Sequence, residues 1–207
     1  MLPREFYARD AELVAQALIG CQLVIADGAK GDGWHVRIVE TEAYVGSHDL
    51  ASHSSKGRTK RTEVMFGPAG HAYVYLIYGM YNMLNIVTGQ VGEGQAVLIR
   101  GVEVIQSLHK IDVMSLKTDG PGKLCKVLGI TRDHNGQDLQ SSGLYLTRGR
   151  SPTKLAVSPR IGIDYAGDWK DAPLRFFDPD SQQVSKPKKA MSYIDAPSLL
   201  DDNHCYI

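Results

Sequence analysis

The sequence has few cysteines and no long hydrophobic run, and each shortage excludes a class of protein. Its cysteines, Cys21, Cys125 and Cys205, are widely spaced and form no CxxC pair. An odd set of this kind is not a disulfide framework and lacks the ligand spacing of a structural zinc site. No run of about 18 apolar residues occurs, and the N-terminus lacks the apolar region of a secretory signal. We therefore expect a cytoplasmic protein without a membrane span.

Net charge is also absent, because 23 lysines and arginines balance 23 aspartates and glutamates. Nucleic-acid-binding domains are usually strongly basic, so this average argues against one. The average hides a pattern, however. Residues 51–163 carry 14 basic and 7 acidic side chains, whereas residues 1–50 and 164–207 are both net acidic. A basic block in the middle of the chain indicates a polyanionic partner.

The length and composition indicate a single globular domain over residues 1–207, since 43% of the 207 residues are hydrophobic and 22% charged. Helical spacing of apolar residues predicts helices over 10–19 and from about Lys123 to Gly129. Apolar and β-branched runs predict strands over 21–26, 34–45, 72–77, 81–87, 96–104, 160–164 and 174–177. A polar turn is expected at 27–33 and a polar tail of uncertain role at 180–207. The pattern predicts an α+β fold with an antiparallel sheet and peripheral helices.

Two carboxylates and an arginine are the strongest candidates for chemistry. Glu40, Glu42 and Tyr44 share one face of a predicted strand, because side chains alternate along a strand. Two carboxylates on one face can serve as base and acid, or can simply form a solvated polar surface. Arg100 stands in an apolar run, where an unpaired charge is costly, so we expect it to pair with Glu40 or Glu42. Such a pair would keep a carboxylate ionised and orient water beside it.

Tyrosines are dense around a predicted hairpin. Tyr73 and Tyr75 share a strand face, where aromatic side chains either pack in the core or line a pocket. Tyr78 adjoins Gly79 at the proposed tip, and an exposed aromatic there suits wedging between DNA bases. Asn85 lies in an otherwise apolar strand, so it is either paired or reads a ligand.

The basic block supplies candidate contacts to DNA. Arg58 and Arg61 adjoin a long polar loop, and Lys123 follows Gly120-Pro121-Gly122 at a predicted helix start. Backbone N–H groups and a lysine at that start either bind one backbone phosphate or only cap the helix. The segment lacks the spacing of a nucleotide P-loop.

Metal, dinucleotide and covalent hydrolase chemistry have little support. His48, Asp49 and His53 match no strong metal motif, and we expect no metal and no other cofactor. Neither a GxGxxG segment before a helix nor a GxSxG segment occurs. His53 could instead donate a hydrogen bond in a pocket.

Taken together, these segments resemble the alkyladenine DNA glycosylase family, also called the 3-methyladenine or methylpurine DNA glycosylases. The resemblance covers roughly residues 3–178. The segments that carry it follow one another in the expected order: Arg37-Ile-Val-Glu-Thr-Glu-Ala-Tyr44, Ala51-Ser-His53 with Gly57-Arg-Thr59, Met65-Phe-Gly-Pro68, Tyr73-Val-Tyr-Leu-Ile-Tyr-Gly-Met-Tyr81 with Leu84-Asn-Ile86, Val97-Leu-Ile-Arg100, Gly120-Pro-Gly-Lys-Leu-Cys125 and Ser158-Pro-Arg-Ile-Gly-Ile163.

The resemblance implies a partly barrel-like antiparallel sheet and a hairpin that inserts into the DNA minor groove. It implies that Glu42 is the general base that activates water and that Arg100 helps to hold that water and the carboxylate. The residues implied to form the pocket for a flipped base are Tyr44, His53 and Tyr75, with Asn85 at the wall against the exocyclic amine of guanine. The residues implied at the DNA wedge are Tyr78, Met80 and Tyr81.

The implied function is that of a monofunctional DNA glycosylase acting as a monomer on damaged double-stranded DNA. It would flip out 3-methyladenine or 7-methylguanine, with hypoxanthine and ethenoadenine as further candidates, and leave an abasic site for base excision repair. No lysine matches a Schiff-base role, so no lyase activity is expected. The alternatives are an inactive damaged-DNA-binding protein of the same fold and a hydrolase of free nucleosides.

Overall fold

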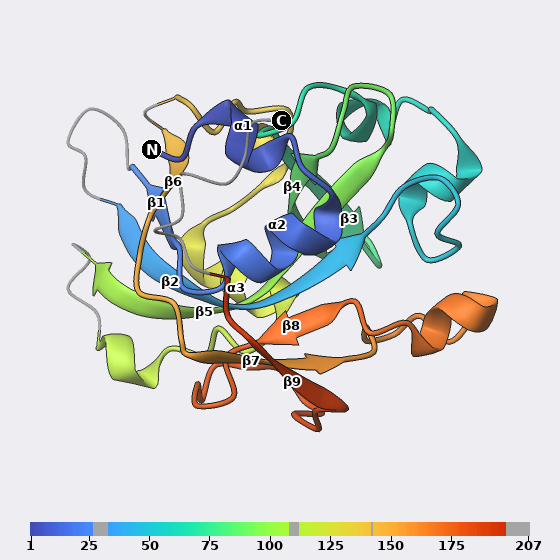
Figure 1. Ribbon diagram of the computed structural model, residues 1–207. Coiled ribbons are helices and arrows are strands. Elements are labelled where there is room, and N and C mark those ends of the chain that lie inside the picture. Colours follow the sequence, from blue (N-terminus) through green and yellow to red (C-terminus); the bar gives the residue numbers. More distant parts are fainter. Residues whose placement is uncertain (27–32, 108–111, 142, 198–207) are drawn as a thin grey trace.

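A nine-stranded antiparallel sheet forms the centre of the molecule (Figure 1). The computed structural model describes residues 1–26, 33–107, 112–141 and 143–197. The main path of the sheet runs in the order β3 (Ala72–Ile77), β4 (Tyr81–Thr88), β5 (Gln95–Ser107), β2 (Trp34–Tyr44), β8 (Arg175–Phe177), β7 (Lys154–Ser158) and β9 (Ser192–Asp195). Off this path, β1 (Gln22–Ile25) pairs with both β2 and β6 (Leu144–Thr147).

The sheet is open, so the expected partly barrel-like closure is wrong. The path begins at β3 and ends at β9, and the described pairings do not join these two strands. The extra strands β1 and β6 branch from β2 instead of bridging the ends. The long, twisted strands β2 and β5 therefore form a curved central ribbon on which the rest of the molecule packs.

Helices are few and short in the described residues. The α-helices are α1 (Arg4–Tyr7), α2 (Ala11–Leu18) and α3 (Pro121–Leu128). Single turns of 3₁₀-helix lie at His53–Lys56, Glu63–Phe66, Val113–Ser115, Arg132–His134 and Gly167–Asp171. Among these helices we find no segment with the length and hydropathy of a membrane span.

Most predicted elements are confirmed, and one is wrong. The helix expected from Lys123 begins two residues earlier, at Pro121, and ends before Gly129, whose φ of 68° is left-handed. The strand expected over 160–164 is a loop, because Gly162 has a φ of 76° that a β-ladder cannot accommodate. Three short strands, β6, β7 and β9, are additional to the prediction. Residues 27–32 of the expected turn and Cys205 lie outside the described residues.

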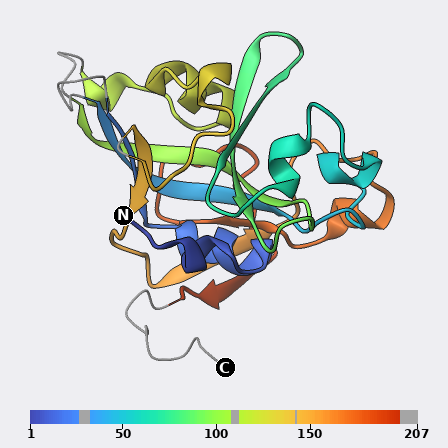
Figure 2. The same cartoon turned by 90° about the horizontal axis from the view of Figure 1, so that it is seen from above.

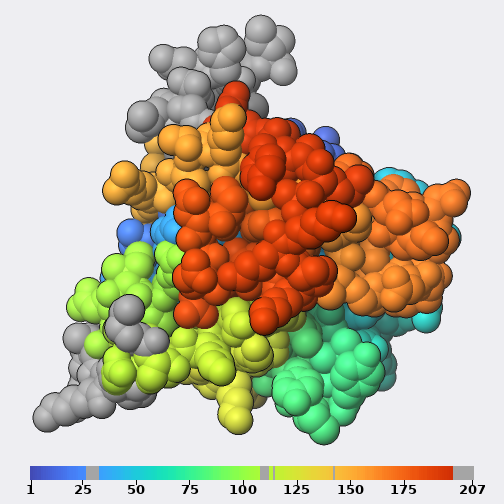
Figure 3. Space-filling model, turned by 90° about the horizontal axis from the view of Figure 1, so that it is seen from below, coloured from blue at the N-terminus to red at the C-terminus, as the bar shows by residue number. Residues whose placement is uncertain are grey.

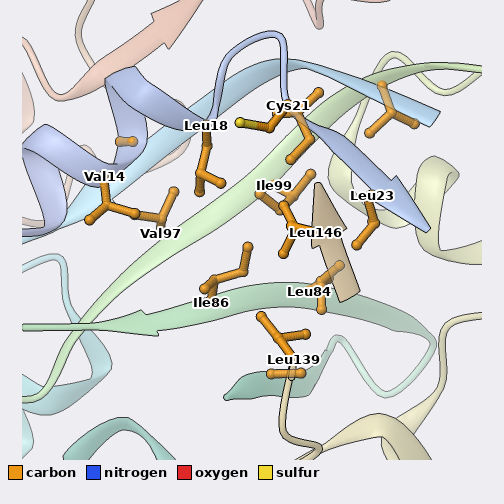
Figure 4. Close-up of a cluster of buried hydrophobic side chains, with 14 of the residues drawn as sticks. Val14, Leu18, Cys21, Leu23, Leu84, Ile86, Val97, Ile99, Leu139 and Leu146 are labelled. Carbon is orange, nitrogen blue, oxygen red and sulfur yellow. The ribbon is translucent and has the colours of Figure 1, made fainter. Parts of the chain in front are cut away.

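The main hydrophobic core lies between α2 and the central ribbon (Figure 4). Val14 and Leu18 of α2 point toward Val97 and Ile99 of β5, and all four side chains are fully buried. Burying each such side chain contributes roughly 1.5–3 kcal/mol. This packing fixes α2 on one face of β2 and β5, and it leaves the other face of the ribbon free to carry polar groups.

A paired irregularity in β2 and β5 reverses which side chains face the core. In the register of these two fully described strands, Ile38 pairs with Val102, Glu40 with Gly101 and Thr41 with Ile99. Val39 and Arg100 are therefore skipped and have no partner in the register. Simple alternation from Ile38 would turn the next even-numbered side chains, Glu40 and Glu42, toward the core. β-Bulges redirect side chains in this way, and they are common beside active sites.

The hairpin and the C-terminal segment lie on different parts of the molecule. Seen from above, the β3–β4 hairpin projects beyond the body of the sheet (Figure 2). Seen from below, the described residues after β8, coloured orange-red to red, cover the centre of the face opposite α1 and α2 (Figure 3). β4 of the hairpin pairs with β5, and Ser185 binds Glu40 of β2, so the bulge lies between the hairpin and the C-terminal part of the chain.

Candidate active site

A cavity of about 140 Å³ lies beside the central ribbon. It is close in size to an engineered protein cavity of about 150 Å³ that admits benzene, so one flat ring system fits the scale. The lining comes from four strands, two loops and the start of α3. Its residues are Tyr44, Ala51, His53, Met65, Tyr73, Tyr75, Ile77, Met83, Asn85, Leu98, Arg100, Pro121, Ile161, Gly162, Ile163 and Tyr165.

Glu42 lies directly behind the wall of this cavity. Its carboxylate is fully buried and accepts a hydrogen bond of 2.7 Å from the Ile161 backbone N–H and one of 2.9 Å from the Tyr44 hydroxyl. Both donors line the cavity. A carboxylate has about four lone-pair sites, so these bonds leave acceptor capacity for a further donor such as water.

Arg100 connects Glu42 with Glu40. Its Nη1 lies 3.3 Å from Glu42 Oε1, and its Nε donates to Glu40 Oε1 at 3.2 Å. Burial alone would lower the pKa of Arg100, but the two carboxylates outweigh this effect and raise its pKa above the ordinary value. The guanidinium is therefore permanently charged, and the expected pairing with Glu40 or Glu42 is confirmed as a pairing with both.

Glu40 has the same residue type and burial as Glu42 but a different environment. Its Oε1 accepts from Arg100, from Arg175 Nε at 2.7 Å and from Ser185 Oγ at 2.7 Å, and its Oε2 accepts from the Ser185 backbone N–H at 2.7 Å. Within the described residues, the cavity lining includes Arg100 but neither carboxylate. Ile161 and Tyr44, which bind Glu42, belong to the lining, whereas Arg175 and Ser185, which bind Glu40, do not. With four donors on two oxygens, Glu40 is saturated, which leaves Glu42 as the carboxylate available for chemistry.

Aromatic side chains form one wall of the cavity. The rings of His53 and Tyr75 lie 4.4 Å apart in a T-shaped arrangement, and His53 Nδ1 lies 3.1 Å from the Tyr73 hydroxyl. Burial, assisted by the cations Arg61 and Lys56, lowers the pKa of His53 to about 4. His53 is therefore uncharged near neutral pH, and the cavity wall carries no positive charge at this position.

Tyr44 is held between Glu42 and a buried ion pair. Burial, followed by the Glu42 carboxylate, raises the pKa of Tyr44 well above its ordinary value, so its hydroxyl stays protonated and donates. The Arg160 guanidinium lies 4.8 Å from the Tyr44 ring centroid and binds Asp49 through two bonds of 2.5 and 2.9 Å. This fully buried pair fixes the 159–163 loop that brings Ile161 to Glu42.

Asn85 lies at the cavity wall with its orientation fixed. Its Nδ2 donates to the backbone carbonyls of Tyr73 and Met83 at 3.1 and 3.4 Å. An inverted amide would place its oxygen against two carbonyl oxygens. The side chain is 4% exposed, so it forms a rigid part of the wall.

The hairpin tip presents an exposed, strained tyrosine. Tyr78 is 83% exposed and has a φ of 53°, while Gly79 has a φ of 69°. Positive φ at both central residues is the geometry of a type I′ turn, where a bulky residue is unusual. Met80 and Tyr81 are also exposed, and Ile77, which precedes Tyr78, lines the cavity. The exposed apolar tip is therefore joined directly to a residue of the cavity wall.

The predicted basic contacts lie on the surface with partners of their own. Arg58 binds Glu63 through bonds of 2.6 and 2.9 Å, and Lys123 lies 3.0 Å from Asp119 at the start of α3. Arg61 lies 5.3 Å from the Tyr75 ring centroid, which places it beside the aromatic wall. A backbone phosphate would have to compete with Glu63 for Arg58 and with Asp119 for Lys123.

The histidines and acids of the 48–53 loop have structural partners. Asp49 binds Arg160, and the His48 ring packs against Trp169 at 5.4 Å. In the part of the chain that the structure describes, no group of three or more His, Cys, Asp or Glu residues is placed to hold a metal ion.

Several site residues were not singled out from the sequence. The 159–163 loop supplies Arg160 and Ile161, and Tyr165, which is 72% exposed, lines the cavity mouth. The segment Ser158-Pro-Arg-Ile-Gly-Ile163 carries part of the family resemblance, and the predicted strand over 160–164 overlaps it. The glycine and proline within it were the available signal of a loop.

Comparison with known proteins agrees with this geometry. The sequence model of the family described as "Methylpurine-DNA glycosylase (MPG)" matches residues 5–182. A protein of Myxococcus xanthus named "Putative 3-methyladenine DNA glycosylase" is 54% identical over 187 residues, covering 89% of this chain and 93% of the relative. Proteins with the same name from Legionella pneumophila (strain Lens) and Methanocella arvoryzae are 51% and 48% identical, covering 89% and 90% of this chain and 98% and 96% of the relatives.

The match covers well over half of the chain and includes the strands, hairpin and loop that build the cavity. Relatives of about half identity align along almost their entire length. The chain therefore belongs to the methylpurine-DNA glycosylase family and is a DNA N-glycosylase of DNA repair.

Proposed function

We propose that the protein removes 3-methyladenine and 7-methylguanine from duplex DNA, with Glu42 activating the attacking water. The observation that carries this proposal is the setting of Glu42. It is fixed by Ile161 and Tyr44, it lies beside the permanently charged Arg100, and it retains acceptor capacity at the wall of a ring-sized cavity.

The water would be held between the Glu42 carboxylate and Arg100. As the bond between base and sugar breaks, the sugar acquires oxocarbenium character, and a carboxylate beneath it stabilises that charge. Glu42 accepts the proton of the water as its oxygen attacks the anomeric carbon. With one base, one water and no covalent nucleophile, the reaction is a direct displacement with inversion at the sugar, and no lyase step follows.

The flipped base would occupy the cavity between Tyr44 on one side and His53 and Tyr75 on the other. Burial raises the pKa of Tyr75, so its hydroxyl is protonated, and His53 is neutral. Electron-rich rings attract a cation over their faces. This wall favours a cationic alkylated purine over a neutral base, and a cationic base also leaves the sugar easily. Asn85 would disfavour the exocyclic amine of normal guanine. 7-Methylguanine carries the same amine, so its removal would depend on its positive charge, which weakens the bond to the sugar.

The hairpin would open the duplex. Tyr78 projects from a turn whose positive φ values hold it away from the sheet, and Met80 and Tyr81 flank it. Extruding a base costs a few kcal/mol of free energy. An aromatic side chain that stacks in the vacated site contributes about 1–3 kcal/mol and offsets part of this cost. Arg58, Arg61 and Lys123 would contact phosphates on either side of the wedge.

The test is release of free base from duplexes that each carry one lesion, compared with undamaged duplex and with spontaneous depurination. We expect release of 3-methyladenine and 7-methylguanine, and slower release of the neutral bases hypoxanthine and ethenoadenine, which need a proton donor to leave. Binding to these duplexes without release of any base would favour the inactive damaged-DNA-binding protein. Equal release from free nucleosides would favour a nucleoside hydrolase, for which the wedge has no purpose.

A further inference from the structure

A short C-terminal segment, residues 183–187, reaches the candidate active site from behind. It lies beyond residues 5–182, which the family model matches. Ser185 donates its hydroxyl and its backbone N–H to Glu40, each at 2.7 Å. Its hydroxyl oxygen also lies 3.3 Å from Arg100 Nη2. One serine thus touches both the saturated carboxylate and the arginine that faces Glu42.

The segment is tightly fixed at both ends. Gln183 Oε1 accepts from the Thr118 backbone N–H at 3.0 Å, and Arg175 donates to the carbonyls of Ser185 and Pro187 at 2.9 Å each. A Cβ on Gly101 would lie 2.4 Å from the Gln183 carbonyl oxygen, so a side chain there would displace the segment. Figure 3 shows this part of the chain as a continuous layer over the centre of its face.

The covered cluster is fully buried and balanced in charge. The side chains of Glu40, Glu42 and Arg175 are at most 1% exposed and that of Arg100 is 9% exposed. Glu40 is bound by two guanidinium groups and by Ser185, so it can hold Arg100 in one orientation without rearranging. Charged groups held by further hydrogen bonds lose little free energy to reorganisation when charge develops in a reaction.

From this arrangement we infer that Ser185 and Glu40 are positioning residues for the glycosylase reaction. Ser185 fixes Glu40, Glu40 fixes Arg100, and Arg100 presents Nη1 to Glu42 at the cavity wall. This inference rests on the proposed roles of Glu42 and Arg100. It assigns to Ser185, alone in the C-terminal segment, a positioning role that requires no contact with DNA.

The test compares Ser185→Ala with Val184→Ala. Val184 is 1% exposed and packs against Val39 and Phe177, so its truncation loosens the same segment without removing a bond to Glu40. Single-turnover base release from dimethyl-sulfate-treated duplex is measured for each variant. Affinity is measured with a duplex whose 2′-fluoro nucleotide resists hydrolysis. We expect Ser185→Ala to lower the rate about tenfold, the scale of one hydrogen bond to a charged group, with unchanged affinity. We expect Val184→Ala to keep the wild-type rate per folded molecule.

A pH profile separates positioning from simple loss of folded protein. The charged or titratable groups around the cluster, within the described residues, are Glu40, Glu42 and Tyr44 of β2, Asp49 of the following loop, Tyr75 of β3, Arg100 of β5, Arg160 and Tyr165 of the loop after β7, and Arg175 of β8. Glu40→Gln removes one negative charge, so the remaining cations favour the ionised form of their neighbouring carboxylate. The acid limb of the single-turnover rate should therefore move to lower pH, whereas a loss of folded protein alone scales the whole profile.

The outcomes distinguish this inference from the proposed function. If the wild type releases no methylated base, or if Glu42→Gln cleaves like the wild type, the proposed function fails. If those two results are as expected but Ser185→Ala matches Val184→Ala in rate per folded molecule, the positioning role is wrong. An unmoved acid limb in Glu40→Gln would also overturn it.

Discussion

Two regions on the same strand use the same residue type in opposite ways. Glu40 lies under the C-terminal segment with four donors on its two oxygens, whereas Glu42 lies two residues further on, beside the cavity, with acceptor capacity left over. Both are fully buried, so burial does not distinguish them. The number of bound donors distinguishes them, and so does the place of those donors: Ile161 and Tyr44, which bind Glu42, line the cavity, whereas Arg175 and Ser185, which bind Glu40, are not among its lining residues. A carboxylate becomes a candidate base where the fold leaves part of it unsatisfied.

The largest expected effect on stability is at the covered carboxylate. Glu40→Gln leaves Arg100 and Arg175 facing one carboxylate fewer, and breaking a buried ion pair in this way costs about 3 kcal/mol or more. The free energy of unfolding, measured in urea, should fall by this amount, whereas Glu42→Gln, which keeps the Arg100–Glu40 pair, should cost clearly less. Equal losses in the two variants would remove the distinction between the two regions.

A second prediction concerns the exposed tip, where Tyr78 has a left-handed backbone conformation and a proposed role as the wedge. Tyr78→Asn relieves a left-handed conformation that costs roughly 1–3 kcal/mol for an ordinary residue, because asparagine tolerates positive φ. The unfolding free energy should rise by about 1 kcal/mol, while affinity for lesion duplex should fall about tenfold with the lost stacking. Tyr78→Phe is the matched control and should keep most of the affinity. Unchanged affinity in Tyr78→Asn would contradict the wedge.

A third prediction uses the neutral histidine of the cavity wall. Because the pKa of His53 is lowered to about 4 in the folded protein, the unfolded chain binds more protons between about pH 4 and 6.5, and stability falls as the pH drops through that range. At pH 5 this contribution amounts to about 1–2 kcal/mol. His53→Gln should flatten the dependence of unfolding free energy on pH between 7 and 5. A slope identical to that of the wild type would show that His53 is not protected from protonation.

The smallest expected effect is a change in DNA affinity at the pair of Arg58 and Glu63. This pair is exposed, unlike the buried ion pairs of the site. Arg58→Ala should reduce the slope of log affinity against log salt concentration by about one for undamaged DNA. Glu63→Gln frees the guanidinium for phosphate and should raise affinity a few-fold at low salt. Base release at saturating enzyme should stay unchanged in both variants. Opposite or absent changes in affinity would remove Arg58 from the DNA contacts.

The sequence predicted the residues of the site better than it predicted their arrangement in space. Alternation placed Glu40, Glu42 and Tyr44 on one face, and their shared contacts around Arg100 confirm it. The paired bulge at Val39 and Arg100 could not be read from the pattern. It depends on how β2 and β5 meet, a tertiary contact that leaves no periodic signal in either strand.

The elements that sequence reasoning missed are those whose signals are short or mixed. β9 is largely exposed and stands in a lysine-rich polar segment, so its four residues carry no alternation of polarity. The strand predicted over 160–164 is part of a loop, since Gly162 has a φ of 76°. Its contact with Glu42 is made by the Ile161 backbone N–H. Every residue except proline has this group, so no pattern of side chains could predict the contact.

The most direct test of the account is single-turnover base release by Glu42→Gln on dimethyl-sulfate-treated duplex, corrected for spontaneous depurination. Removing a general base costs about 10²–10⁴-fold in rate. We predict a fall of about 10³-fold with unchanged affinity for lesion duplex, and a smaller fall for Glu40→Gln per folded molecule. A Glu42→Gln rate within about tenfold of the wild-type rate would contradict the assignment of Glu42 as the base. So would a rate per folded molecule that is lower for Glu40→Gln than for Glu42→Gln.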